Sequence, residues 1–344
     1  MKKLLIAVAL AGVLGSANAA EEKVLNLYNW TEYMPKEVLK AFTKETGIKV
    51  KESNYASTEE MYAKLKAGGG GYDLVVPSTY FVQRMAREGL LEPLDHTKLP
   101  NLKNVDPKFL DQPFDPGNQH SVPYLLSSVG ITVDSAKVDP KTITSWLDLW
   151  KPEYKGNVLL MDVARETFAV VQKALGYSAN DTDPAHIEAA FNKMKELLPS
   201  VKLFNAESPK VSFIQGEVSV GITWNGEAFM GQQEKKSLTF VYPKEGVILA
   251  MDTMAIPKGA KHPDNAHKFL NFVMRPEIAA KISESLGYGT LNAEAIKLLP
   301  KELASNRIVY PTADDLKNAE LLEDIPTETQ GLYEKYWSEL KTAK

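Results

Sequence analysis

The chain contains no cysteine among its 344 residues. No disulfide can therefore form, and neither a thiol nucleophile nor a thiolate metal ligand is available. The absence also removes any cysteine that could carry a lipid anchor after an export signal. A chain of this length can bury a core large enough to be stable without covalent cross-links.

A strong charge of one sign is missing as well. The formal net charge is -4 and 24% of the residues are charged, with no basic cluster along the chain. A mildly acidic protein of this kind is a poor partner for nucleic acid, which is bound mainly through lysine and arginine. We therefore expect no nucleic-acid partner. The charge is compatible with a cationic ligand but does not require one.

Apart from the first residues, the sequence has no uninterrupted apolar run of the kind that an export signal or a membrane span requires. Residues 4–14 are apolar, follow the pair Lys2-Lys3 and precede the small residues 17–19. This order is typical of a secretory signal peptide, and we expect cleavage after Ala19. The apolar run is too short to span a bilayer. The sequence thus predicts an exported protein, without membrane insertion after signal removal, in the periplasm of a two-membrane bacterium.

Recognisable catalytic motifs are also lacking. The five histidines do not fall in a metal-ligand spacing, and no Gly-x-Ser-x-Gly elbow occurs. The glycine run of residues 68–71 is not followed by Lys-Ser/Thr, so it does not fit a phosphate-binding loop. We therefore expect no enzyme, no metal and no cofactor. An enzyme that uses a serine or aspartate outside any known motif ranks last among the alternatives.

Segments typical of strands alternate with segments typical of helices, which predicts an α/β fold. Two apolar stretches, 122–133 and 247–256, are expected to cross between two α/β units. At about 150 residues per domain, the length also suggests two domains. We predict two lobes, each a mostly parallel sheet flanked by helices, with a ligand cleft between them. Their expected extents are 1–19 for the signal peptide, 20–130 plus 252–300 for the first lobe, and 131–251 plus 301–344 for the second.

Aromatic and acidic residues gather where predicted strands end. In open α/β sheets ligands bind beyond the carboxyl ends of the strands, and aromatic faces attract cations. Each residue also has a structural explanation: the rings could be core residues, and Glu166 could pair with Arg165 or Lys173. As a group they fit a slender organic cation whose ammonium groups are spaced by methylenes. The group comprises Trp30, Tyr33, Tyr80, Glu166, Trp224, Asp252 and Tyr288.

Seven motifs stand in the order of a known family: Tyr-Asn-Trp-Thr-Glu-Tyr, Lys-Glu-Thr-Gly-Ile-Lys-Val, Tyr-Asp-Leu-Val-Val-Pro-Ser-Thr-Tyr, Trp-Lys-Pro-Glu-Tyr-Lys-Gly, Ala-Arg-Glu, Ile-Thr-Trp-Asn-Gly and Met-Asp-Thr-Met-Ala-Ile-Pro. Over essentially the whole mature chain, the sequence resembles the periplasmic spermidine/putrescine-binding proteins of bacterial ABC polyamine importers. The resemblance implies a type II periplasmic binding fold that closes on its ligand by a hinge motion. It also implies delivery of a polyamine to the membrane permease subunits of an importer.

The resemblance also implies residue roles. Trp30, Tyr33, Ser78 and Tyr80 would bind ligand from the first lobe with Asp252 and Tyr288, while Glu166 and Trp224 would bind it from the second. Asp252 would be the buried partner of an ammonium group.

Three positions depart from the family pattern. At the position of Val163 the spermidine-preferring members have a carboxylate residue. They have a tryptophan at the position of Ala250 and a glutamine at that of Leu322. These changes leave the choice between spermidine and putrescine open. They also motivate two alternatives, a binding protein for another small organic cation and, on the same fold, a polyamine-sensing adaptor for a membrane signalling protein.

Overall fold

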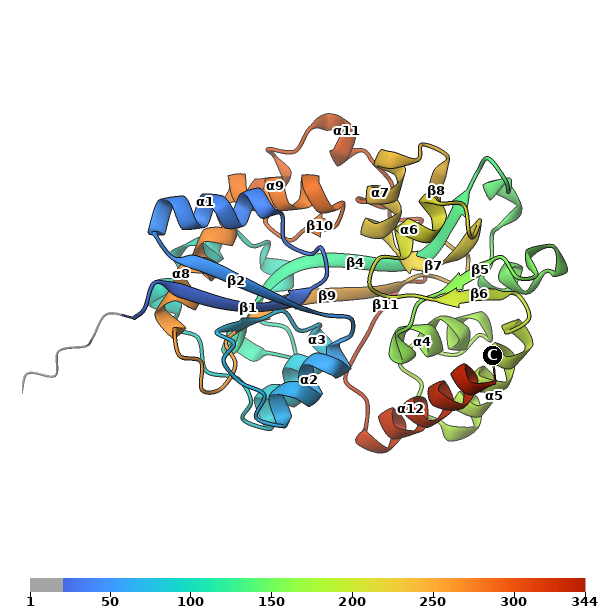
Figure 1. Cartoon of the computed structure of the whole chain (residues 1–344), viewed down its shortest axis with the longest axis horizontal. Helices are drawn as coiled ribbons and strands as arrows, with labels where there is room; N and C mark the ends of the chain where they lie inside the picture. Colours follow the sequence, from blue (N-terminus) through green and yellow to red (C-terminus); the bar gives the residue numbers. More distant parts are fainter. Residues whose placement is uncertain (1–20, 344) are drawn as a thin grey trace, which may run out of the picture.

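The computed structural model describes residues 21–343, so the expected signal peptide lies outside the described residues. Two α/β lobes lie side by side along the long axis of the molecule (Figure 1). Their strands form one continuous sheet in the order β2-β1-β3-β9-β4-β7-β5-β6. The predicted two-lobed α/β architecture is confirmed.

The first lobe is built on three parallel strands, β1 (Val24–Trp30), β2 (Lys49–Tyr55) and β3 (Leu74–Val75). In β1, Leu25 and Leu27 are fully buried in one core cluster, while Tyr28 belongs to another. This alternation is expected of a strand with helices on both faces. The helices of this lobe are α1 (Lys36–Thr46), α2 (Thr58–Lys66), α3 (Thr79–Arg87), α8 (Pro263–Val273) and α9 (Pro276–Leu286).

The second lobe repeats the plan with the parallel strands β5 (Val158–Leu160), β6 (Val201–Phe204) and β7 (Val220–Trp224). A core cluster that includes Phe168 and Tyr333, whose rings stack with centroids 4.6 Å apart, joins three helices of this lobe. These are α4 (Ala164–Ala174), α5 (Pro184–Leu197) and α12 (Thr327–Thr342). The lobe also holds α6 (Pro209–Ile214), α7 (Asn225–Glu234) and β8 (Leu238–Val241).

Two long strands carry the sheet from one lobe to the other. β4 (Ser121–Asp134) and β9 (Ile248–Ala255) pair antiparallel along most of their length. β9 continues to β3 through Val75 and Ala255, and β4 continues to β7 from Val129 onward. These strands correspond to the two apolar stretches predicted to cross.

The remaining elements are short. Strand β11 (Glu320–Leu321) pairs with β9, and β10 (Gly289–Thr290) pairs with β4. The short helices are η1 (His96–Lys98), η2 (Pro100–Asn104), η3 (Pro107–Phe109), η4 (Pro116–Asn118), η5 (Pro140–Thr142), η6 (Trp146–Trp150), η7 (Pro152–Tyr154), α10 (Ala293–Ile296) and α11 (Lys301–Ala304). No helix within residues 21–343 has the length and apolar character needed to cross a membrane.

Two local features lie beside the cavity edge of β3. The apolar run of residues 72–77 forms a strand only over Leu74–Val75, and the carbonyl of Pro77 accepts hydrogen bonds from the backbone N–H and the hydroxyl of Thr253 on β9. Ser78 stands at the N-cap of α3, but its side chain makes no capping hydrogen bond. Its hydroxyl is used elsewhere, as described below.

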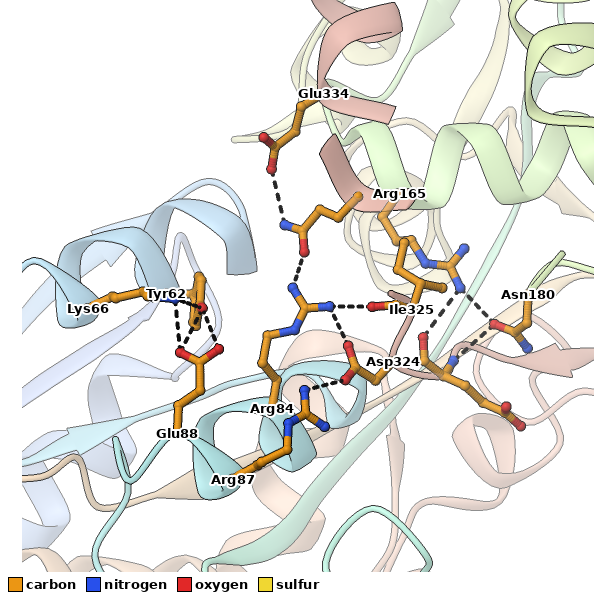
Figure 2. Close-up of polar contacts among 12 residues, drawn as sticks. Tyr62, Lys66, Arg84, Arg87, Glu88, Arg165, Asn180, Asp324, Ile325 and Glu334 are labelled. Atoms are coloured by element: carbon orange, nitrogen blue, oxygen red, sulfur yellow. Dashed lines mark hydrogen bonds and ion pairs between the residues drawn. The ribbon is translucent and has the colours of Figure 1, made fainter. Parts of the chain in front are cut away.

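Hydrogen bonds and an ion pair join the segment between β11 and α12 to side chains of both lobes (Figure 2). From α3 of the first lobe, Arg84 donates to Asp324 at 2.5 Å, to the carbonyl of Ile325 at 2.6 Å, and to Gln330. From α4 of the second lobe, Arg165 donates to the carbonyl of Glu323 at 3.4 Å. This segment therefore connects the lobes on the side of α2, α3 and α12.

Arg84 and Arg87 offer a matched test of this connection, because both contact Asp324 but their side chains are 5% and 62% exposed. We expect Arg84→Met to lower the free energy of unfolding by about 3–5 kcal/mol, since it breaks a buried ion pair. Arg87→Met should cost less than about 1 kcal/mol. Urea denaturation of both variants measures the difference, and equal losses would contradict a structural role specific to Arg84.

Candidate functional site

A cavity lies between the two lobes at the strand exits. It encloses about 490 Å³, including space open to solvent, which is within the range of small-molecule sites. Seven of the eight residues predicted from the sequence line it. The lining residues are Trp30, Thr31, Tyr33, Tyr55, Ser78, Ser127, Glu166, Ala206, Glu207, Trp224, Glu227, Ala250, Asp252 and Tyr288.

Asp252 is a buried carboxylate on β9, the strand shared by the lobes. It accepts hydrogen bonds from the hydroxyl of Tyr33 at 2.7 Å and from that of Ser78 at 2.5 Å. Burial raises the pKa of Asp252 to about 6, although the two hydrogen bonds act in the opposite direction. Both partners are neutral donors, so they orient the carboxylate but leave its charge uncompensated.

Glu166 is the second buried carboxylate of the cavity and lies in the first turn of α4. It accepts a hydrogen bond from the indole N–H of Trp224 at 2.8 Å. Burial, followed by the nearby carboxyls of Asp252 and Glu59, raises the pKa of Glu166 to about 8. Neither cation considered from the sequence pairs with it: Arg165 binds Asn180, and Lys173 binds Glu320. The structure thus removes the salt-bridge explanation of Glu166.

Aromatic rings from both lobes form the walls of the cavity. Trp30, at the end of β1, and Trp224, at the end of β7, approach edge to face with ring centroids 6.4 Å apart. Tyr33 and Tyr288 make a second edge-to-face pair at 5.1 Å. These rings present apolar surface and π faces beside the buried carboxylates, a combination that suits an organic cation.

Tyr80 is the predicted site residue that does not line this cavity. It is buried, and it lines a neighbouring cavity together with Glu59, Arg84 and Arg165. Ser78 lies at the N-cap of α3, and Tyr80 follows two residues later within the helix. Ser78 has an extended backbone with φ of -68° and ψ of 150°, and its hydroxyl binds Asp252, whereas the Tyr80 ring packs within the helix beside the neighbouring cavity.

Sequence reasoning missed several lining residues, most notably Glu227. Glu227 lies in the first turn of α7, three residues after Trp224. Its carboxylate is buried and accepts from the ammonium of Lys210 at 3.4 Å and from the Lys210 backbone N–H at 3.1 Å. Its place in the Trp-Asn-Gly-Glu strand exit was a usable signal for Glu227. The sequence around Lys210, on the short helix α6, gave no comparable signal.

The three departures from the family pattern have different surroundings. Ala250 lines the cavity. Val163 is buried at the N-cap of α4, and Leu322 is buried in the largest core cluster. Neither Val163 nor Leu322 is among the lining residues. Of the three, Ala250 is therefore the one that changes the wall of the cavity.

Comparison with known proteins agrees with this fold and site. Residues 37–310 match the family model of the bacterial extracellular solute-binding proteins, and the chain belongs to this family of transport proteins. The spermidine/putrescine-binding periplasmic protein of Escherichia coli K12 is 48% identical over 344 residues, which span 100% of this chain and 99% of that protein. The resemblance to the periplasmic spermidine/putrescine-binding proteins is confirmed, and the protein is periplasmic.

Two further relatives are informative. The putrescine-binding periplasmic protein of Escherichia coli K12 is 33% identical over 359 residues, covering 99% of this chain and 97% of that protein. A solved structure described as a spermidine/putrescine ABC transporter from Listeria monocytogenes superposes with a TM-score of 0.89 at 39% identity. It covers 94% of this chain and 100% of that one.

The raised pKa of Glu166 predicts how the stability of the ligand-free protein varies with pH. The folded-state pKa of about 8 lies above the ordinary value of 4.5, so the folded protein keeps a proton that the unfolded chain releases. Its contribution to stability is fully present below about pH 4.5 and is lost as the pH rises to about 8.

Glu166→Gln should therefore gain stability relative to the wild type between pH 5 and pH 8, by on the order of 3 kcal/mol. Thermal denaturation of both proteins without ligand measures this gain. Glu207→Gln, which removes an exposed carboxylate from the rim of the same cavity, is the matched control. A constant difference between Glu166→Gln and the wild type at all pH values would contradict the prediction.

Proposed function

We propose that the protein captures polyamines, spermidine or putrescine or both, and delivers them to the membrane permease subunits of an ABC importer. One observation carries the proposal: Asp252 and Glu166, two buried carboxylates without a cationic partner among residues 21–343, face one cavity walled by aromatic rings. The relatives at 48% and 33% identity, named for binding spermidine/putrescine and putrescine, support the same ligand class.

The proposed binding chemistry follows from the side chains. Each carboxylate takes one ammonium group, and charge-assisted hydrogen bonds hold it in a low-dielectric site. The indoles of Trp30 and Trp224 flank the methylenes between the ammonium groups, with cation–π attraction at the ends. Tyr33 and Ser78 orient Asp252, while Tyr288 closes the wall beside Tyr33. Tyr80 is not part of the proposed contact set, because it lines the neighbouring cavity.

The proposal is non-enzymatic. Asp252 accepts from two hydroxyls and Glu166 from an indole N–H, and none of the five histidines of the sequence is among the residues that line the cavity. Membership in a family of solute-binding transport proteins supports the same view.

The first test of this function removes the charge of Asp252. Asp252→Asn should weaken putrescine and spermidine binding by at least about 100-fold, because the ligand ammonium then lies desolvated without its anion. Titration calorimetry measures the affinities, and circular dichroism checks the fold. Asp264→Asn, an exposed change on α8, is the control. Unchanged affinity in Asp252→Asn would rule out the anchoring role, and no heat with either amine in the wild type would remove the polyamine proposal.

The second test uses proton release. With a pKa of about 8, Glu166 is mostly protonated at pH 7 and must ionise to hold an ammonium group. Binding at pH 7 should therefore release about one proton, and affinity should rise as the pH increases from 6 to 8. Calorimetry in buffers of different ionisation enthalpy counts the protons. Glu166→Gln should abolish the release, and a wild-type value near zero would contradict Glu166 as an ammonium partner.

A further inference from the structure

A lysine of the protein occupies a position between two carboxylates at the edge of the cavity. Lys210, on α6 of the second lobe, places its ammonium 3.4 Å from Glu227 of the same lobe and in an ion pair with Glu32 of the first lobe. The ammonium also donates to the hydroxyl of Ser208 at 3.0 Å. The Lys210 side chain is only 8% exposed. This lysine is therefore an internal cation, held by residues of both lobes.

Glu227 connects this cluster to the cavity. Its side chain is 7% exposed, and it lines the cavity with Asp252 and Glu166. Glu32 has a left-handed backbone with φ of 55°, a conformation uncommon outside glycine, and it directly follows Thr31, another lining residue. An ammonium group between Glu227 and Glu32 would be chemically equivalent to the end of a polyamine chain. Lys210 supplies that group from within the protein.

The number of unpaired buried carboxylates determines how many ammonium groups of a ligand can each pair with an anion. The carboxylates of Asp252, Glu166 and Glu227 are buried, whereas Glu32 is 54% exposed and partly solvated. The Lys210 ammonium neutralises Glu227, so two buried anions remain for the ligand. Two anions match the two ammonium groups of a diamine. The third ammonium of a triamine would be desolvated without a free partner, which is costly.

We infer that Lys210 is a specificity-determining residue: it fills a third cation subsite, formed by Glu227 and Glu32, and thereby favours diamines over triamines. This inference rests on the proposed polyamine-binding function and names the residue that selects within that ligand class.

The experiment compares two affinities in each variant by titration calorimetry at pH 8, with putrescine and spermidine as ligands. We expect Lys210→Met to raise the affinity for spermidine relative to putrescine by at least 10-fold, because Glu227 becomes available to the third ammonium group. The double variant Lys210→Met with Glu227→Gln should return the ratio to within about threefold of the wild type, since the freed anion is gone. Lys210→Gln, which keeps N–H donors toward Glu227, serves if Lys210→Met does not fold.

Lys173→Met is the matched control, because the Lys173 side chain is as buried as that of Lys210 and pairs with Glu320, which unlike Glu227 does not line the cavity. It should leave the spermidine-to-putrescine ratio unchanged. A purely structural role of Lys210, such as holding the lobes together, would weaken both amines in parallel and overturn the inference. An unchanged ratio in both Lys210 variants would overturn it as well. Failure of the wild type to bind either amine would instead overturn the proposed function, and the inference with it.

Discussion

The site depends on two buried carboxylates, Asp252 and Glu166, that have no cationic partner within residues 21–343. Burying an ionised carboxylate is unfavourable, and burial raises both pKa values: Glu166, with a pKa of about 8, is mostly protonated at pH 7, whereas Asp252, with a pKa of about 6, stays mostly ionised. The partners of both groups are neutral donors, which fix the geometry without satisfying the charge. A ligand cation can therefore supply the positive charge that these two carboxylates lack within residues 21–343. In the proposed function, the same feature couples ligand binding to proton release from Glu166.

The positions of these groups follow from the sheet. Asp252 lies on β9, which together with β4 joins the lobes, so the anchoring anion belongs to the connection itself. Trp30 ends β1 in one lobe and Trp224 ends β7 in the other, and their ring centroids lie 6.4 Å apart between the lobes. Ion pairs made by Lys210 and by Arg84 hold the lobes in this arrangement from separate places. The cavity is therefore a product of lobe orientation as much as of local structure.

Residues whose role depends on local pattern could be predicted from the sequence. The strand exits identified Trp30 and Trp224, and Asp252 stood out as a charge in the apolar stretch 247–256. Residues whose role depends on packing could not. Lys210 meets Glu227 because α6 packs against α7, and it meets Glu32 because the lobes approach. The sequence alone also could not show that Tyr80 lines the neighbouring cavity, because that depends on how α3 packs beside Glu59 and Arg165.

The preference between diamines and triamines depends on two free-energy costs: a missing aromatic ring in the cavity wall and an ammonium group without an anion. Val163 and Leu322 lie in the core, so their apolar character affects packing, while Ala250 lines the cavity at the position where the family resemblance implies a tryptophan in spermidine-preferring members. A missing ring over a cation costs roughly 0.5–2 kcal/mol for any polyamine that passes it. An ammonium group without an anion in a desolvated site costs several kcal/mol, and only a triamine has the extra group. The number of free buried carboxylates therefore discriminates between amines more strongly than the aromatic wall, and Lys210 controls that number.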